Sequence, residues 1–313
     1  MAFKPAMDDA TVAKLLLVLL SFCWGLSWPA MRIALDEVSP WTLRFFGYSI
    51  GAATLFALLT VQGRRLAIPF GRAWLHVAAA SLFIVVAFGL AGTFAQLAAT
   101  TSRVIIVTYS MPVWGSLMAW LVLRERVNRR AVIGLALCVA GLAVLVYPVM
   151  AETLQAPVGL MLAFVCALSW AGGTVYMKWA RIKGDLVAIT FWQVVLGMVV
   201  FAIGFLIFQG APSIEPLQWR TWGGILFNGV MGTGIAYFVW FNIIGRLSTA
   251  MASLGALSNP VVGIVGSAIL LGERPTTADM IGFALIFSAA ACVLLPQRRR
   301  PPQPPNEAQA PAA

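Results

Sequence analysis

Charged residues are scarce in this chain, because Asp, Glu, Lys and Arg make up only 10% of its 313 residues. Soluble domains carry about 25% of such residues, whereas here hydrophobic residues reach 61%. This composition excludes a domain that folds in water and predicts an integral membrane protein. The net charge of +10 would suggest nucleic-acid binding in a soluble protein. Here the basic residues stand in short loops between apolar runs, so we interpret them as topology signals and expect no nucleic-acid partner.

Residues that carry catalytic chemistry are also few. The chain has one histidine, His76, near the end of an apolar run, and its four cysteines all lie inside apolar runs. The sequence contains no CxxC pair and no cluster of metal-ligand residues, so it indicates neither a disulfide framework nor a metal site. It also lacks a glycine-rich phosphate loop and a nucleophile–base pair. We therefore expect no enzyme activity, metal or cofactor, with a membrane enzyme or scaffold as the alternative.

Acidic residues are missing from the middle of every apolar run. All eleven Asp and Glu residues lie in loops, in the tails or at the ends of the runs. Proton-coupled exporters of cations typically need an ionisable group at membrane depth. The absence disfavours a drug or organic-cation exporter, which stays the main alternative within transport. It favours facilitated diffusion down a gradient, with coupling to an ion as the alternative.

Ten apolar runs approach the length of about 20 residues that a helix needs to cross a bilayer. They fall at 13–34, 40–61, 74–97, 102–123, 130–149, 157–178, 186–208, 221–243, 248–271 and 278–296. We therefore predict an all-α membrane protein of ten transmembrane helices. Sixteen of the 21 Lys and Arg residues fall on the side that holds both termini, against four in the loops of the other side, which predicts cytoplasmic termini. Residues 1–12 would then be a cytoplasmic N-terminal segment and the proline-rich residues 297–313 a disordered cytoplasmic tail.

The two halves of the chain are related to each other. Residues 110–137 and 258–285 align without a gap at an offset of 148, with 11 identities in 28 positions. Each half, 13–149 and 150–296, contains five spans, and an odd number makes the matched helices cross the membrane in opposite directions. The sequence therefore predicts two inverted five-helix repeats, the arrangement of many transporters whose halves rock about a site near the midplane.

Short fragments that recur in order and spacing carry a family resemblance. They are Trp24-Gly25, Pro112-Val113 with Pro260-Val261, the L-x-E-R of Leu123 to Arg126 with the L-G-E-R of Leu271 to Arg274, and the Y-x-x-W of Tyr237 to Trp240. Over nearly the whole chain the sequence resembles the ten-helix EamA-type members of the drug/metabolite transporter superfamily. The resemblance implies export of small metabolites or toxic compounds across the bacterial inner membrane. The family includes drug exporters and amino-acid exporters, among them aromatic amino-acid exporters of the YddG type, and we expect amino acids as substrates.

Two tryptophans fall near the centres of spans, where Leu, Ile and Val are usual. Trp24 and Trp170 correspond at an offset of 146 in the first and sixth spans. An indole N–H in hydrocarbon needs a hydrogen-bond partner, so we expect both rings to face a central cavity and contact substrate, with helix packing as the alternative. We assign Trp28 to the interface or to packing and Trp240 to the inner interface. The further substrate-binding candidates are Phe88, Tyr109, Tyr237 and Asn259.

Prolines stand in the middle of the fourth and ninth spans at corresponding positions, Pro112 and Pro260. Each removes a backbone donor and bends its helix. We expect both to face other helices or water and to act as hinges, although ordinary kinks would also place proline there.

Charged residues follow the same two spans as Glu125-Arg126 and Glu273-Arg274. They either pair locally at the helix ends or form a gate that opens and closes as the halves rock. Arg44 and Arg103 lie near the ends of spans two and four, where they can snorkel or contact a substrate carboxylate. The sequence thus predicts a mostly uncharged aromatic cavity, open alternately to each side of the membrane, in a protein that works as a monomer.

Overall fold

The structure is a computed structural model that describes residues 9–125, 129–149, 155–209, 216–244 and 249–294. All regular elements within these residues are helices. The predicted tail 297–313, most of segment 1–12 and the gate candidate Arg126 lie outside the described residues.

Helical stretches occur at all ten predicted spans. In the first half they are α1 (Asp9–Ala34), α2 (Pro40–Val61), α3 (Arg72–Ser81), the π-helix η1 (Leu82–Ala87), α4 (Phe88–Ala98), α5 (Thr101–Thr108), α6 (Met111–Leu123) and α7 (Arg129–Val149). In the second half they are α8 (Gln155–Ala180), α9 (Leu186–Gln209), α10 (Trp219–Leu226), the π-helix η2 (Phe227–Ile235), α11 (Ala236–Ile244), α12 (Thr249–Leu271) and α13 (Thr277–Leu294). In the described part of the chain, nine stretches have the length and hydropathy of a membrane span, and Leu257–Leu271 is a shorter apolar helix. The predicted all-α multi-pass membrane fold is confirmed.

The helices are apolar on their exposed outer side as well as on the side that packs against other helices. In α9, Phe201 and Phe205 are buried, while Ile203, Leu206 and Ile207 are 53–68% exposed. A helix that is hydrophobic all round suits a lipid environment, and its internal hydrogen bonds satisfy the backbone there.

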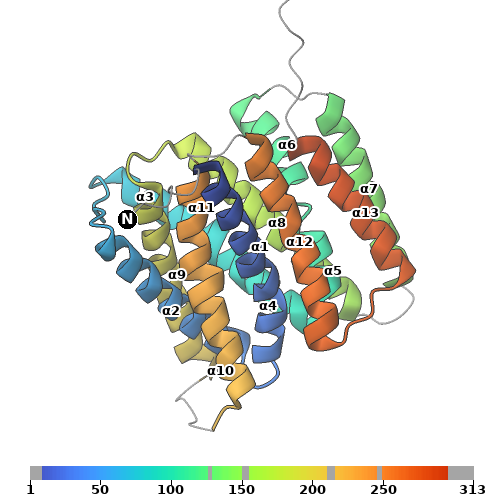
Figure 1. The fold of residues 1–313 in the computed structure, drawn as a ribbon, viewed down its shortest axis with the longest axis horizontal. Helices are drawn as coiled ribbons and strands as arrows, with labels where there is room; N and C mark the ends of the chain where they lie inside the picture. The colour runs from blue at the N-terminus through green and yellow to red at the C-terminus, as the bar shows by residue number, and fades with distance from the viewer. Residues whose placement is uncertain (1–8, 126–128, 150–154, 210–215, 245–248, 295–313) are drawn as a thin grey trace, which may run out of the picture.

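Helices from the two halves of the chain pack against each other (Figure 1). Helix α1 packs against α12. At one end of the molecule α2 packs against α9, and at the other end α7 packs against α13. Because α1 and α7 belong to the first half and α12 and α13 to the second, the core forms between the halves.

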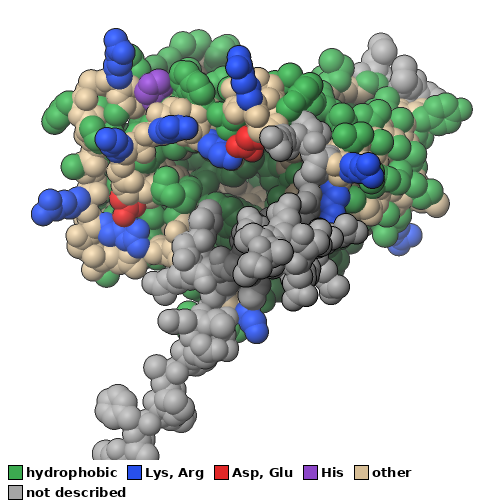
Figure 2. Space-filling view, turned by 90° about the horizontal axis from the view of Figure 1, so that it is seen from above, with side chains coloured by type: hydrophobic (Ala, Val, Ile, Leu, Met, Phe, Trp, Pro, Cys, Tyr) green, Lys and Arg blue, Asp and Glu red, His purple; other side chains and the backbone are tan. Residues whose placement is uncertain are grey.

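The helix ends define two faces. One, called here the basic face, carries Arg65, Arg72, Arg124, Lys178 and Arg181 where spans end or begin. Figure 2 looks onto this face, where Lys and Arg side chains gather around a hollow. The opposite face is the one where α5, α10 and α13 begin.

A π-helix interrupts the third span of each half. The segments η1 (Leu82–Ala87) and η2 (Phe227–Ile235) overlap when the halves are offset by the same 148 residues that align the sequence repeat, and both then end at the same position. Single π-helical turns inside α-helices are frequent at functional sites. Their matching positions support the predicted repeat.

Glycines in and beside η2 let neighbouring helices approach closely. A side chain at Gly229 would lie 2.7 Å from Cβ of Ile50 and 2.8 Å from the carbonyl oxygen of Gly47, both on α2. At Gly224 it would lie 2.5 Å from the carbonyl oxygen of Ala30 on α1. These contacts indicate that the glycines serve close helix packing, as small residues commonly do in membranes.

We expect Gly229→Val to lower the melting temperature of the detergent-solubilised protein, because overpacking costs about 1–3 kcal/mol. Gly223→Val is the matched control, since a side chain at Gly223 would meet no other atom within 4 Å. The measurement is thermal unfolding, with the folded fraction monitored by size-exclusion chromatography. Equal losses in both variants would contradict the packing role of Gly229.

Candidate functional site

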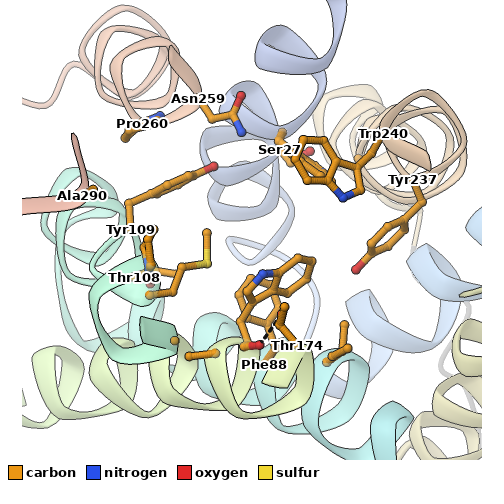
Figure 3. Close-up of a pocket in the computed structure, with 18 of the residues that line it drawn as sticks. Ser27, Phe88, Thr108, Tyr109, Thr174, Tyr237, Trp240, Asn259, Pro260 and Ala290 are labelled. Carbon is orange, nitrogen blue, oxygen red and sulfur yellow. Dashed lines mark hydrogen bonds between the residues drawn. The ribbon is translucent and has the colours of Figure 1, made fainter. Parts of the chain in front are cut away.

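A cavity of about 630 Å³ lies between the two halves and extends to the basic face. This volume is within the range of about 300–1,000 Å³ that is usual for small-molecule sites. Lys178, Leu186 and Leu294 line its end at the basic face, and Met31 and Arg44 line its deep end. Figure 3 shows side chains from several helices converging on the space.

Aromatic rings form the middle of the cavity wall. The ring of Trp24 lies 6.4 Å from that of Trp170, 6.1 Å from Tyr237 and 5.5 Å from Trp240, measured between centroids. Trp170 lies 5.0 Å from Phe88 and stacks on Tyr237 at 6.3 Å with an interplanar angle of 12°. These five residues are called here the aromatic cluster. All of them line the cavity, so the structure brings together rings from α1, α4, α8 and α11.

The sequence predicts an interface or packing position for Trp28 and the inner interface for Trp240, and both residues line the cavity. Trp28 is 7% exposed and lies 6.2 Å from Phe88, which agrees with the packing alternative. Trp240 also lines the cavity, beside Trp24. Residues four apart share one face of a helix, so Trp28 follows Trp24 into the cavity. That spacing is the sequence signal that could have placed it there.

Polar groups line the wall that faces the aromatic cluster. The fourth span is interrupted between α5 and α6 at Tyr109 and Ser110, and the hydroxyl of Tyr109 points toward Asn259 of α12 (Figure 3). Thr108 and Asn259 are 0% and 2% exposed. In the described part of the protein, their side-chain oxygens Oγ1 and Oδ1 have no hydrogen-bond partner. Buried polar atoms without partners are costly and rare, so these two oxygens are candidate ligand acceptors.

The two predicted hinge prolines both line the cavity but differ in local structure. Pro112 stands in the first turn of α6, directly after the break in the fourth span. Pro260 lies inside α12, which runs as one helix from Thr249 to Leu271. The fourth span is thus broken beside its proline, whereas the helix of the ninth span continues through Pro260.

Arg44 is a buried cation in the cavity wall, which disfavours snorkelling, one of its two expected roles, and adds a charge to a wall that we expected to be mostly uncharged. It is 8% exposed. Its Nε donates to the carbonyl oxygen of Gly89 at 3.0 Å and to Oγ1 of Thr93 at 2.5 Å, and one terminal nitrogen donates to Sδ of Met31 at 2.9 Å. Arg44 lies on the buried side of α2, and its position near the start of that span does not reveal this in the sequence. The residues that line the cavity in the described structure include Arg44 and Lys178 but no Asp or Glu.

Carboxylates join helix ends of the two halves at the opposite face. Glu273 accepts hydrogen bonds from the backbone N–H groups of Thr101 and Ser102 at 2.7 and 2.8 Å, and from the Ser102 hydroxyl at 2.6 Å. Asp279 pairs with Nε of Arg103 at 2.7 Å, and both side chains are nearly buried. Glu273 thereby caps the start of α5, where a negative charge is favourable.

The remaining gate candidates are more exposed. Glu125 pairs with Lys178 at the basic face, and their side chains are 46% and 63% exposed. Arg274 is exposed and forms no ion pair with a described residue. Glu273 therefore bonds across to another span instead of pairing with its sequence neighbour.

Comparison with known proteins agrees with this architecture. The model of the EamA-like transporter family matches residues 11–147 and 157–295, once in each half. A protein named "Probable amino-acid metabolite efflux pump" from Salmonella typhimurium is 26% identical and covers 90% of this chain and 92% of its own length. "Uncharacterized transporter YoaV" from Bacillus subtilis is 25% identical over 86% of this chain and 92% of its own.

A protein of known crystal structure shares the fold. It superposes with a TM-score of 0.64 at 22% identity, over 90% of this chain and 95% of that one. Within the described residues, no group of three or more His, Cys, Asp or Glu could hold a metal ion. The family match over both halves confirms the resemblance noted in the sequence: the chain belongs to the EamA-like transporter family.

Proposed function

We propose that this protein exports small metabolites, chiefly amino acids including aromatic ones, from the bacterial cytoplasm by alternating access. One observation carries the proposal: a cavity lined by the aromatic cluster reaches the basic face, while carboxylates at the opposite face bond helix ends of the two halves to each other. The positive-inside tendency assigns the basic face to the cytoplasm. In this assignment both termini are cytoplasmic, the protein lies in the inner membrane, and the cavity is open to the cytoplasm.

The chemistry of the wall supports an amino acid as substrate. Trp24, Phe88 and Trp170 offer flat apolar surface to a side chain, and Tyr109 and Asn259 offer hydrogen bonds. The cavity wall in the described structure has no carboxylate to attract an organic cation, which weighs against the drug-exporter alternative. Two relatives carry the name of amino-acid metabolite efflux pumps, which also favours this class over a membrane enzyme or scaffold.

The contacts suggest how the two faces alternate. Glu125 and Glu273 correspond at the offset of 148, and so do Thr249 and Thr101. When the basic face closes, Glu125 would leave Lys178 and accept from the N–H groups at the start of α12, as Glu273 does at the start of α5. Flexure at Pro112 and Pro260 would accompany the change. We propose that the solute moves down its gradient through a single copy of the chain, without nucleic acid or cofactor.

Counterflow in proteoliposomes tests the proposal. Vesicles preloaded with unlabelled phenylalanine are expected to take up labelled phenylalanine transiently above equilibrium, because one site serves both sides. Protein-free vesicles are the control. Vesicles preloaded with unlabelled tetraphenylphosphonium and supplied with the labelled cation test the organic-cation alternative. Counterflow with the cation but with none of a panel of amino acids would contradict the proposal.

A further inference from the structure

We infer that Arg44 binds the carboxylate of the transported solute and makes the cavity select amino acids over the corresponding amines. The inference rests on the proposed function and names the group that the site recognises. Arg44 is the buried cation of the cavity: its residue is 8% exposed, whereas the side chain of Lys178 is 63% exposed and paired with Glu125.

Arg44 has no anionic partner among the described residues. Its hydrogen bonds go to neutral acceptors, the carbonyl of Gly89, the hydroxyl of Thr93 and the thioether of Met31, and its guanidinium lies 5.8 Å from the ring centre of Tyr48. A charge inside a membrane protein is expensive unless an opposite charge or water compensates it. In a cavity that opens to one face, an anionic group of the solute can supply that compensation.

The neutral partners also orient the guanidinium. The bonds to Gly89 and Thr93 use Nε, and the one to Met31 uses a terminal nitrogen. An arginine has five N–H donors in a planar fork, so terminal donors are left for the two oxygens of a carboxylate.

The rest of an amino acid would find matching groups in the same cavity. Phe88, which precedes Gly89 in the chain, belongs to the aromatic cluster and would contact the side chain of the solute. The unpartnered oxygens of Thr108 and Asn259 accept hydrogen bonds, and the ammonium group of an amino acid donates them. Arg44, the aromatic cluster and these two oxygens thus correspond to the three parts of an aromatic amino acid.

The experiment compares tryptophan with tryptamine, which lacks the carboxylate, as competitors of labelled tryptophan counterflow. Wild-type protein is expected to prefer tryptophan by about 10-fold or more, as expected for a charge-assisted bidentate contact. Arg44→Gln is expected to remove that preference by weakening tryptophan alone, and Arg44→Lys to retain part of it. Arg32→Gln is the matched control, because Arg32 pairs with Asp36 outside the cavity, and it should keep the wild-type preference.

The outcomes separate the inference from the proposed function. A wild-type protein with which tryptophan and tryptamine compete equally well, or a folded Arg44→Gln variant that still prefers tryptophan, overturns the role of Arg44 and leaves transport standing. A wild-type protein that moves no amino acid overturns both. If Arg44→Gln does not fold, as judged by size-exclusion chromatography, competition by tryptophan, tryptamine and tryptophanamide against the wild-type protein tests the inference. Only tryptophan, which has a free carboxylate, should compete tightly.

Discussion

Replacing Trp170 with alanine is expected to reduce the transport of aromatic substrates by about 10-fold or more, since each aromatic contact is worth about 0.5–1.5 kcal/mol. Trp170 lies at the centre of the aromatic cluster, 5.0 Å from Phe88, 6.4 Å from Trp24 and 6.3 Å from Tyr237. The substitution removes one wall of the cavity and loosens the three rings around it. The same reasoning applies to Trp24, which contacts the cluster from α1.

Initial rates of counterflow in proteoliposomes measure this effect, with protein amounts matched by size-exclusion chromatography. Trp179→Ala is the control on the same helix, because Trp179 is 52% exposed and does not line the cavity. It should transport at the wild-type rate. A well-folded Trp170→Ala variant that transports as fast as the wild type would remove the aromatic cluster from the substrate site.

Glu273→Gln is expected to open the face that Glu273 now closes. The carboxylate accepts three hydrogen bonds from Thr101 and Ser102. Hydrogen bonds to charged groups contribute about 1.5–3 kcal/mol, so loss of the charge should shift the conformational equilibrium by about 10- to 100-fold. Transport requires each face to open and to close again. We therefore also expect slower transport, because the variant would spend longer in the state that is open at that face.

Cysteine labelling at Val104 reports this opening. Val104 is 0% exposed and lies one turn into α5, so a Val104→Cys residue in a background without native cysteines should react slowly with a soluble maleimide in detergent. Adding Glu273→Gln should accelerate the reaction about 10-fold or more, in proportion to the open population. Adding Glu125→Gln, the corresponding change at the basic face, should not. Equal labelling rates with and without Glu273→Gln would mean that this carboxylate caps α5 without gating the cavity.

Much of the site could be anticipated from the sequence. Trp24 and Trp170 stand out because aromatic residues are unusual at the centre of a span, and Pro112 and Pro260 stand out because proline breaks the helical pattern. All four line the cavity. The positions of Arg44 and Trp240 could not be inferred from the sequence in the same way, since an arginine or tryptophan near a span end has an ordinary explanation at the interface.

The hydrogen-bond partners of the charged residues could not be predicted from the sequence either. The sequence suggests that Glu273 pairs with the adjacent Arg274, whereas the carboxylate bonds to Thr101 and Ser102, which are more than 170 residues away along the chain. Adjacency in sequence gives no information on which helix ends meet across the interface of the two halves.

The sequence by itself determined the membrane class, the ten spans and the family. These follow from composition and from runs of bilayer length, because lipid requires every crossing segment to be apolar and to satisfy its own backbone. The tertiary structure alone decided which side of each helix faces the cavity and which helix ends the carboxylates of the opposite face contact. The physical reason is that a membrane helix is apolar toward both lipid and protein, so its pattern carries little record of the direction in which it packs.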